Sequence, residues 1–204
     1  MAVDNSSEKL ISPTSMGHFG VRTPPEHYQA MVKWHLDFFG GKAVWHNEHA
    51  TMITFDEEHH REVIVSDPAY KIIEDRQHAA GIYHIAFHLP MLADLATSYE
   101  QKKARGIVPH WPVNHGMTTS MYYFDPTGNE FELQVNNFDT TDEARQFMET
   151  PEFQINPIGV DLVMDEWLKR VRSGEDEKIL KKRPVIGTRK TRWENSIYFK
   201  PEEK

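Results

Sequence analysis

The feature of this sequence that most constrains its fold is an internal repeat. The string HFGVRTP at 18–24 resembles HIAFHLP at 84–90, and both begin with His and end with Pro. Farther along, TMITFD at 51–56 matches SMYYFD at 120–125. The offset between the copies changes from 66 to 69 residues, which indicates a short difference in length between them. Two duplicated units of about 60 residues are the simplest explanation.

Each copy has the same order of predicted elements. In the first, Pro24 and Pro25 are typical of a first helical turn, and apolar residues then share one helix face until a Gly-Gly stop at 40–41. In the second, Pro90 precedes a similar helix that ends near Gly106. Short strand-like runs follow each helix, at 42–46, 50–55 and 61–66 in the first copy and at 107–109, 118–124 and 130–136 in the second.

Together with the strand that opens each copy, these elements predict an α+β fold of two βαβββ modules, whose strands form a paired, concave and mostly antiparallel sheet. A chain of 204 residues buries roughly 70% of its unfolded surface, so it can form such a core without disulfides. The predicted organisation is an N-terminal arm at 1–16, a first module at 17–68, a linker at 69–81, a second module at 82–137 and a C-terminal extension at 138–204.

The C-terminal extension is expected to be helical. Thr140 and Glu143 form a candidate capping box at the start of one helix. A second amphipathic helix, marked by regularly spaced apolar residues, is expected to end near Gly174. A polar, basic stretch at 178–192 then precedes a short aromatic segment. We therefore predict an extension that docks on the modules and is less ordered at its end.

Composition excludes several classes of function. The chain contains no Cys, which excludes disulfides, Cys-ligated zinc, iron–sulfur clusters and thiol catalysis. Its net charge of −8 argues against a protein that follows a nucleic-acid backbone. No apolar run reaches the roughly 18 residues of a membrane span, and the first residues lack the apolar run of a secretory signal. We therefore expect a cytoplasmic protein with a small-molecule partner, and neither nucleic acid nor membrane as a partner.

Three residues are candidate metal ligands. His18 and His84 stand at matching places in the two copies, each at the start of a strand, so pairing of the modules about a pseudo-two-fold axis would bring their imidazoles together. Glu132 lies on a predicted strand whose alternation places it on one face with Glu130 and Gln134. Two neutral imidazoles and one carboxylate are the facial-triad ligand set of non-haem Fe(II), which leaves positions open for substrate and oxygen. A single His or Glu could stand at such a place by chance. Two His residues at matching positions of a duplicated unit favour a shared metal site.

These residues resemble the vicinal oxygen chelate superfamily, which includes glyoxalases, bleomycin resistance proteins and extradiol dioxygenases, over 17–137. From His115 to Glu132, and above all in the pattern Tyr-x-x-Asp-Pro-x-Gly-Asn-x-x-Glu, the sequence is similar to single-domain extradiol (meta-cleaving) catechol dioxygenases. The resemblance implies an Fe(II) ion, with Mn(II) as the alternative, bound by His18, His84 and Glu132. It also implies an aromatic diol as the substrate and O2 as the co-substrate.

The same resemblance assigns roles to three further residues. It implies that Tyr122 hydrogen-bonds the bound substrate and that His115 lies close to it. Because an imidazole with a pKa near 6.5 can pass protons at neutral pH, His115 is also the candidate general acid or base. Extradiol enzymes of this kind commonly carry another active-site His before the second metal His. Here His78, six residues ahead of His84 and without a clear motif around it, is the candidate for that role.

Two other functions stay open from the sequence. One is a non-redox metal enzyme of the glyoxalase type, an isomerase, lyase or hydrolase, in which each module contributes two ligands. Aligning 55–56 on 124–125 places Val63 where that second carboxylate would stand, although Glu62 is adjacent to it. The other is a metal-free ligand-binding module of the same fold, against which the retained His and Glu residues argue. Whichever of these functions holds, we expect a homodimer, because dimers with two-fold symmetry are the commonest protein oligomers.

Overall fold

The computed structural model describes residues 10–76 and 78–199. The chain divides into two compact units, Met1–Lys71 and Ile72–Lys204. Part of the predicted N-terminal arm and the last residues of the predicted extension lie outside the described residues. Among the helices that are described, none is long and apolar enough to cross a membrane.

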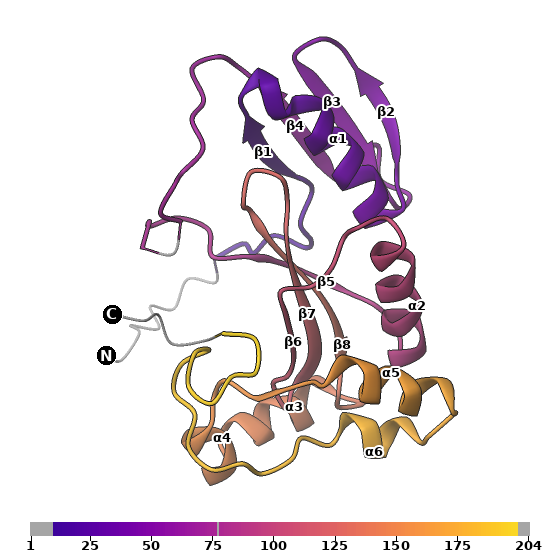
Figure 1. The fold of residues 1–204 in the computed structure, drawn as a ribbon, viewed down its shortest axis with the longest axis vertical. Helices are drawn as coiled ribbons and strands as arrows, with labels where there is room; N and C mark the ends of the chain where they lie inside the picture. Colours follow the sequence, from indigo (N-terminus) through magenta and orange to yellow (C-terminus); the bar gives the residue numbers. More distant parts are fainter. Residues whose placement is uncertain (1–9, 77, 200–204) are drawn as a thin grey trace. The chain divides into compact units, whose positions relative to one another are not determined.

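The first unit is a βαβββ module, as the repeat predicts. Its elements are β1 (Phe19–Thr23), α1 (Pro25–Phe39), β2 (Lys42–His46), β3 (Ala50–Thr54) and β4 (Glu62–Ser66). The strand order is β1-β4-β3-β2, in which β1 is parallel to β4 and the other pairs are antiparallel. Helix α1 covers one face of this sheet (Figure 1). It has Pro at its start, and it ends at Gly40, whose φ of 62° lies in the left-handed region that favours glycine.

The second unit repeats this order and adds a fifth strand. Its module consists of β5 (Ile85–His88), α2 (Leu92–Lys103), β6 (Trp111–Asn114), β7 (Thr118–Phe124) and β8 (Glu130–Asn136). A short strand from the C-terminal extension, β9 (Val160–Asp161), pairs with β6, so that the sheet order is β5-β8-β7-β6-β9. The two modules therefore have the same topology. In the first sheet β2 is the outer strand, whereas in the second sheet its counterpart β6 is followed by β9.

The prediction of a strand at 107–109 is wrong, because the strand at this place, β6, spans Trp111–Asn114. Val108 is exposed, and prolines stand at 109 and 112, on either side of Trp111. Pro112 lacks a backbone N–H and normally disfavours a strand interior. Here the side chains of Trp111 and Val113 pack in one buried cluster with a residue of β7, and this packing outweighs the local propensity.

The turn between β7 and β8 is held by its own polar side chains. The Asp125 carboxylate accepts hydrogen bonds from the backbone N–H groups of Thr127 and Asn129, at 2.8 and 2.9 Å. Gly128 has a φ of +84°, a conformation in which other residues are strained. Arg76 closes the turn from outside by donating to the Asn129 side chain and the Thr127 carbonyl. The Asp-Pro-x-Gly-Asn part of the sequence pattern is therefore structural, and it sets the start and the register of β8.

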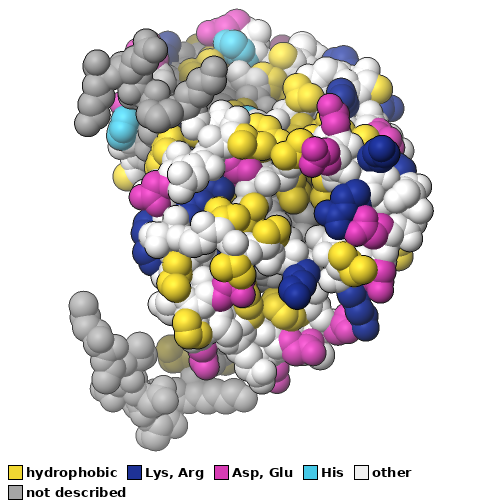
Figure 2. Space-filling model, turned by 60° about the horizontal axis from the view of Figure 1, so that its bottom comes forward, with side chains coloured by type: hydrophobic (Ala, Val, Ile, Leu, Met, Phe, Trp, Pro, Cys, Tyr) yellow, Lys and Arg dark blue, Asp and Glu magenta, His cyan; other side chains and the backbone are white. Residues whose placement is uncertain are grey.

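The C-terminal extension contains helices, as predicted. It contains α3 (Thr141–Met148), α4 (Pro151–Ile155), α5 (Met164–Arg172) and α6 (Glu177–Lys181) besides β9. The predicted capping box of Thr140 and Glu143 is present at the start of α3. Seen from the side of the extension, exposed apolar side chains are interspersed with acidic and basic ones (Figure 2).

Candidate active site

One face of the second sheet carries a row of three large side chains. In the strand register, Trp111 of β6 is opposite Tyr122 of β7, and Tyr122 is opposite Glu132 of β8. All three side chains are buried. Because side chains alternate along a strand, Tyr123 and Phe131 lie on the other face, in the core. The alternation predicted for the strand at 130–136 is thus confirmed.

His84 stands immediately before β5 and lies beside the end of this row. Its Nε2 is 3.0 Å from the Glu132 carboxylate, and its ring is perpendicular to that of Tyr122, with centroids 5.2 Å apart. The imidazole is partly exposed, whereas Glu132 is buried. The structure thus brings together two of the three predicted metal ligands, because β5, which begins directly after His84, pairs in parallel with β8, which carries Glu132.

The His84 and Glu132 donors fit a divalent metal ion in type and in spacing. Two atoms that bind neighbouring positions of an octahedral ion at about 2.1 Å are about 3 Å apart, which is the separation of these two atoms. Imidazole nitrogen with carboxylate oxygen suits iron, manganese or zinc. The Nδ1 atom of His84 is buried and has no hydrogen-bond partner among the described residues. The site is therefore chemically able to hold part of a metal's ligand shell.

Glu132 is held in its ionised form. Burial raises the pKa of this carboxyl, but hydrogen bonds from His84 and Ser120 and the nearby His115 together keep the pKa below its usual value. The pKa of Tyr122 shifts in the opposite direction. Burial and the neighbouring Glu132 charge both raise the pKa of its hydroxyl. At neutral pH the row therefore contains an anionic carboxylate next to a protonated phenol.

His115 completes the site behind Tyr122. Its Nε2 is 3.0 Å from the Tyr122 hydroxyl, and its Nδ1 contacts the Ile158 carbonyl. Because a carbonyl can only accept, Nδ1 must carry a proton. Burial lowers the pKa of His115, so that the ring is neutral and Nε2 accepts from Tyr122. The same hydroxyl is also in hydrogen-bond contact with Glu132. Tyr122 thus has one proton and two acceptors.

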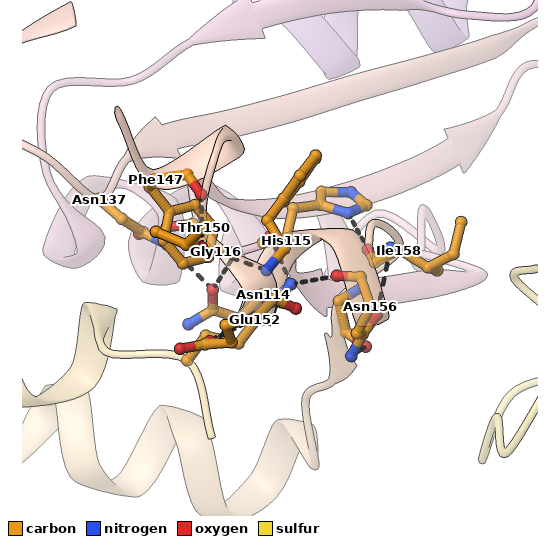
Figure 3. Close-up of polar contacts among 12 residues, drawn as sticks. Asn114, His115, Gly116, Asn137, Phe147, Thr150, Glu152, Asn156 and Ile158 are labelled. Atoms are coloured by element: carbon orange, nitrogen blue, oxygen red, sulfur yellow. Dashed lines mark hydrogen bonds and ion pairs between the residues drawn. The ribbon is translucent and has the colours of Figure 1, made fainter. Parts of the chain in front are cut away.

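The C-terminal extension fixes the position of His115. Asn156 accepts from the backbone N–H groups of Ile158 and Gly159, which shapes the loop that presents the Ile158 carbonyl (Figure 3). Arg183, which is buried, donates to the His115 carbonyl at 3.0 Å and to the Asn156 carbonyl at 2.7 Å. The extension that the sequence separates from the repeat therefore supports a residue of the site directly.

We expect Gly159→Ala to destabilise this part of the site. Gly159 has a φ of +119°, and a Cβ there would lie 2.4 Å from the Asn114 carbonyl oxygen and 2.8 Å from the His115 Cα. Backbone strain alone costs on the order of 1–3 kcal/mol. Thermal unfolding should show a lower Tm than for the unmodified protein, whereas Gly174→Ala, also at positive φ but in open space, should cost less. Equal effects of the two substitutions would contradict the close approach.

In the first unit, His18 stands immediately before β1, as predicted, and its ring lies against that of His60 with centroids 4.5 Å apart. Gly20 pairs with Val63, and in the second unit Ala86 pairs with Glu132. Because Gly20 and Ala86 each lie two residues after the strand-start His, Val63 is the structural equivalent of Glu132. The alignment made from the repeat is confirmed.

Glu62, the carboxylate next to Val63, lies on the opposite face of its sheet. It is completely buried, and its carboxylate pairs with His35 of α1 at 2.7 Å. Its equivalent in the second unit is the core residue Phe131. Glu62 therefore belongs to the packing between α1 and the sheet, and it does not supply a carboxylate on the face where Glu132 lies in the second module.

His78 is exposed, and its ring contacts Asp75 at 2.9 Å. Its proposed role is untested and stays a prediction. Within residues 10–76 and 78–199, no three His, Cys, Asp or Glu side chains are grouped closely enough to hold a metal ion. His18 belongs to the first unit, and the expectation that it completes the ligand set of His84 and Glu132 also stays a prediction.

Three residues near the row were not identified from the sequence. Glu130 is buried on the same face as Glu132 and pairs with His110 at 2.9 Å and with Arg192 at 3.0 Å. The alternation of the strand placed Glu130 on this face and could have drawn attention to it. Arg192 lies in the polar, basic stretch of the extension, and nothing local to it indicates that its side chain reaches β8.

The sequence is similar to those of two named proteins. A protein named biphenyl-2,3-diol 1,2-dioxygenase 2, from Rhodococcus globerulus, is 43% identical over 134 residues, covering 65% of this chain and 70% of the relative. Another from the same organism, biphenyl-2,3-diol 1,2-dioxygenase 3, is 39% identical over 144 residues, covering 71% and 75%. Both relatives are named as dioxygenases of biphenyl-2,3-diol.

The fold has a counterpart among solved structures. A glyoxylase/bleomycin resistance protein/dioxygenase domain from Frankia sp. EAN1pec superposes with a TM-score of 0.53 at 10% identity, covering 63% of this chain and 96% of that one, which supports the fold alone. The model of one protein family matches residues 15–133. By that match, and by its relatives, the chain belongs to the Glyoxalase/Bleomycin resistance protein/Dioxygenase superfamily.

Proposed function

We propose that this protein is an extradiol dioxygenase that inserts both atoms of O2 into an aromatic diol and opens its ring. The observation that carries the proposal is the arrangement of His84, Glu132 and Tyr122 on one sheet face, with an ionised carboxylate 3.0 Å from an imidazole and next to a protonated phenol. The relatives named as biphenyl-2,3-diol dioxygenases support the same reaction class.

His18, His84 and Glu132 would hold the divalent metal, Fe(II) or alternatively Mn(II). When bound, such an ion supplies a Lewis acid for both diol oxygens and the one-electron chemistry that O2 requires. The equivalence of Val63 and Glu132 supports a set of three protein ligands, because the first module has an apolar residue where a glyoxalase-type site would need a fourth. Three ligands leave room for a chelating diol and O2.

Tyr122 and His115 would manage the proton of the diol. The Tyr122 oxygen is placed to accept a proton from a diol hydroxyl while its own proton passes to Nε2 of His115, 3.0 Å away. The Nδ1 proton of His115 stays on Nδ1 throughout, donated to the Ile158 carbonyl, and the nearby Glu132 charge would stabilise the imidazolium that results. Burial of Tyr122 and Trp111 excludes water from this proton path.

The proposal is tested by anaerobic reconstitution with Fe(II), addition of a diol and admission of air. We expect consumption of one O2 per diol, together with the visible absorbance of a ring-opened product, for catechol or biphenyl-2,3-diol. Reconstitution with Mn(II) in parallel identifies which metal the reaction uses. If no diol consumes O2 with either metal, while Zn or Ni supports a reaction without O2, the proposal is wrong and a Lewis-acid isomerase or lyase takes its place.

We expect Tyr122→Phe to lower kcat/KM for the diol by about a hundredfold, because it removes the hydroxyl that links substrate to His115. The matched control is Tyr123→Phe. Tyr123 is the next residue of β7 and is also buried, but it lies on the other face, where its hydroxyl contacts Met121. Oxygen-consumption kinetics should show normal kcat/KM for this control. Equal losses in both variants would assign the Tyr122 effect to packing.

A further inference from the structure

We propose that residues 189–199, here called the C-terminal strap, form the wall against which the second ring of a two-ring diol packs, and that Arg192 is the residue that positions this wall. The inference rests on the proposed function, because it names the substrate class of the same site.

Arg192 attaches the strap to the site face through charge and through ring contacts. It is buried, and both of its terminal nitrogens lie 3.0 Å from a carboxylate oxygen of Glu130. Its guanidinium carbon is 4.7 Å from the ring centroid of Trp111 and 5.9 Å from that of Tyr122. Two guanidinium nitrogens donating to one carboxylate form a strong, directional contact. A planar cation is thus held against two residues of the row.

A second ion pair holds the other part of the strap to the same sheet. Arg189 donates to the Asp161 carboxylate of β9 at 2.7 Å. The Ile197 backbone N–H and the Ser196 hydroxyl donate to the other oxygen of this carboxylate. Trp111 of the row donates its indole N–H to Asp161 as well, at 2.9 Å. One buried carboxylate therefore couples the strap to a side chain of the site.

The strap brings aromatic side chains to this face. Phe199 and Tyr198 pack against the buried cluster that contains Trp111 and Tyr122. The Phe199 ring is 5.7 Å from that of Trp111, and the ring of Trp193, which is 42% exposed, is 6.4 Å from that of Phe199. Aromatic rings in such contacts favour a further ring packed flat or edge-on. A diol held at Tyr122 would place a second ring toward these side chains, whereas a single-ring diol would leave them without contact.

The test compares the kcat and KM of reconstituted enzyme for catechol and for biphenyl-2,3-diol. We expect Arg192→Ala to raise KM for biphenyl-2,3-diol by about tenfold and KM for catechol by less than about threefold, with little change in kcat. Phe199→Leu should shift KM in the same direction, and Arg192→Lys should restore part of the selectivity. The matched control is Arg145→Ala, which removes an exposed arginine paired with Asp142 and should change neither KM.

Equal rises of KM for both diols, or a fall in kcat together with a lower Tm, would overturn the proposal and leave the strap a structural support. If Arg192→Ala does not fold, Phe199→Leu decides by the same criterion. If the unmodified protein consumes no O2 with either diol, the proposed function fails, and anaerobic titration followed by tryptophan fluorescence tests the strap by itself. Tighter binding of biphenyl-2,3-diol than of catechol, lost in Phe199→Leu, would support the strap proposal, and equal binding of the two diols would overturn it.

Discussion

Glu132→Ala should lower the rate of oxygen consumption by about a thousandfold, which corresponds to the loss of several kcal/mol of stabilisation by a bound metal. The substitution removes the buried carboxylate that lies 3.0 Å from His84, so the amount of iron retained after reconstitution and desalting should fall in parallel. Metal analysis and an oxygen electrode measure the two effects on the same sample.

The matched control for this substitution is Gln134→Ala. Gln134 follows Glu132 by two residues on the same strand and the same face, where its side chain contacts His88. It should retain both iron and activity. A Glu132→Ala variant that still binds iron and keeps more than about a tenth of the rate would exclude Glu132 as a ligand, since less than 1.4 kcal/mol would then be lost.

Glu62→Ala should lower the free energy of unfolding by roughly 3 kcal/mol, because it removes one partner of a completely buried polar pair and leaves the other side chain without that partner. Glu62 and His35 are both completely buried, and the His35 Nδ1 atom is 2.7 Å from the Glu62 Oε1 atom. Urea unfolding followed by circular dichroism should show this as a large shift of the transition midpoint. No comparable loss is expected from Lys33→Ala, which breaks an exposed pair with Asp37 on the same helix.

The double variant His35→Leu/Glu62→Leu tests the cause. It replaces both members of the pair by apolar side chains of similar volume, as at the equivalent position of the second module, where Phe131 stands. Such replacements are often neutral or stabilising. We therefore expect the double variant to be more stable than Glu62→Ala. A double variant as unstable as the single one would show that the loss of the His35–Glu62 interaction itself, and not an uncompensated buried group, accounts for the effect.

The order of elements in the two modules could be predicted from the sequence because the signals are local. Proline before each helix, glycine after it and alternation within the strand at 130–136 act through contacts between near neighbours in sequence. The same holds for the turn before β8, where Asp125 bonds to groups two and four residues away. His84 and Glu132 were predicted to bind one metal, and they lie close together because β5, which begins directly after His84, pairs in parallel with β8.

What the sequence left unpredicted depends on contacts between distant segments. Strand β6 forms in spite of Pro112 because Trp111 and Val113 pack against β7. Arg192 reaches Glu130, which lies 62 residues earlier in the chain. No pattern within a window of ten or twenty residues contains such a contact. Charged residues in a basic stretch are commonly solvated, so their burial could be recognised only from the folded chain.

The outer strands of the two sheets have a consequence for how this chain avoids misassembly. β2 is an edge strand of the first sheet, is exposed along its length and presents Val44 and Trp45 to solvent. Its counterpart β6 has its outer side covered by β9. Unpaired edges template the addition of foreign strands. The irregular register between Ala43 and Trp45 interrupts the ladder of β2 and gives the first sheet the protection that a covering strand gives the second.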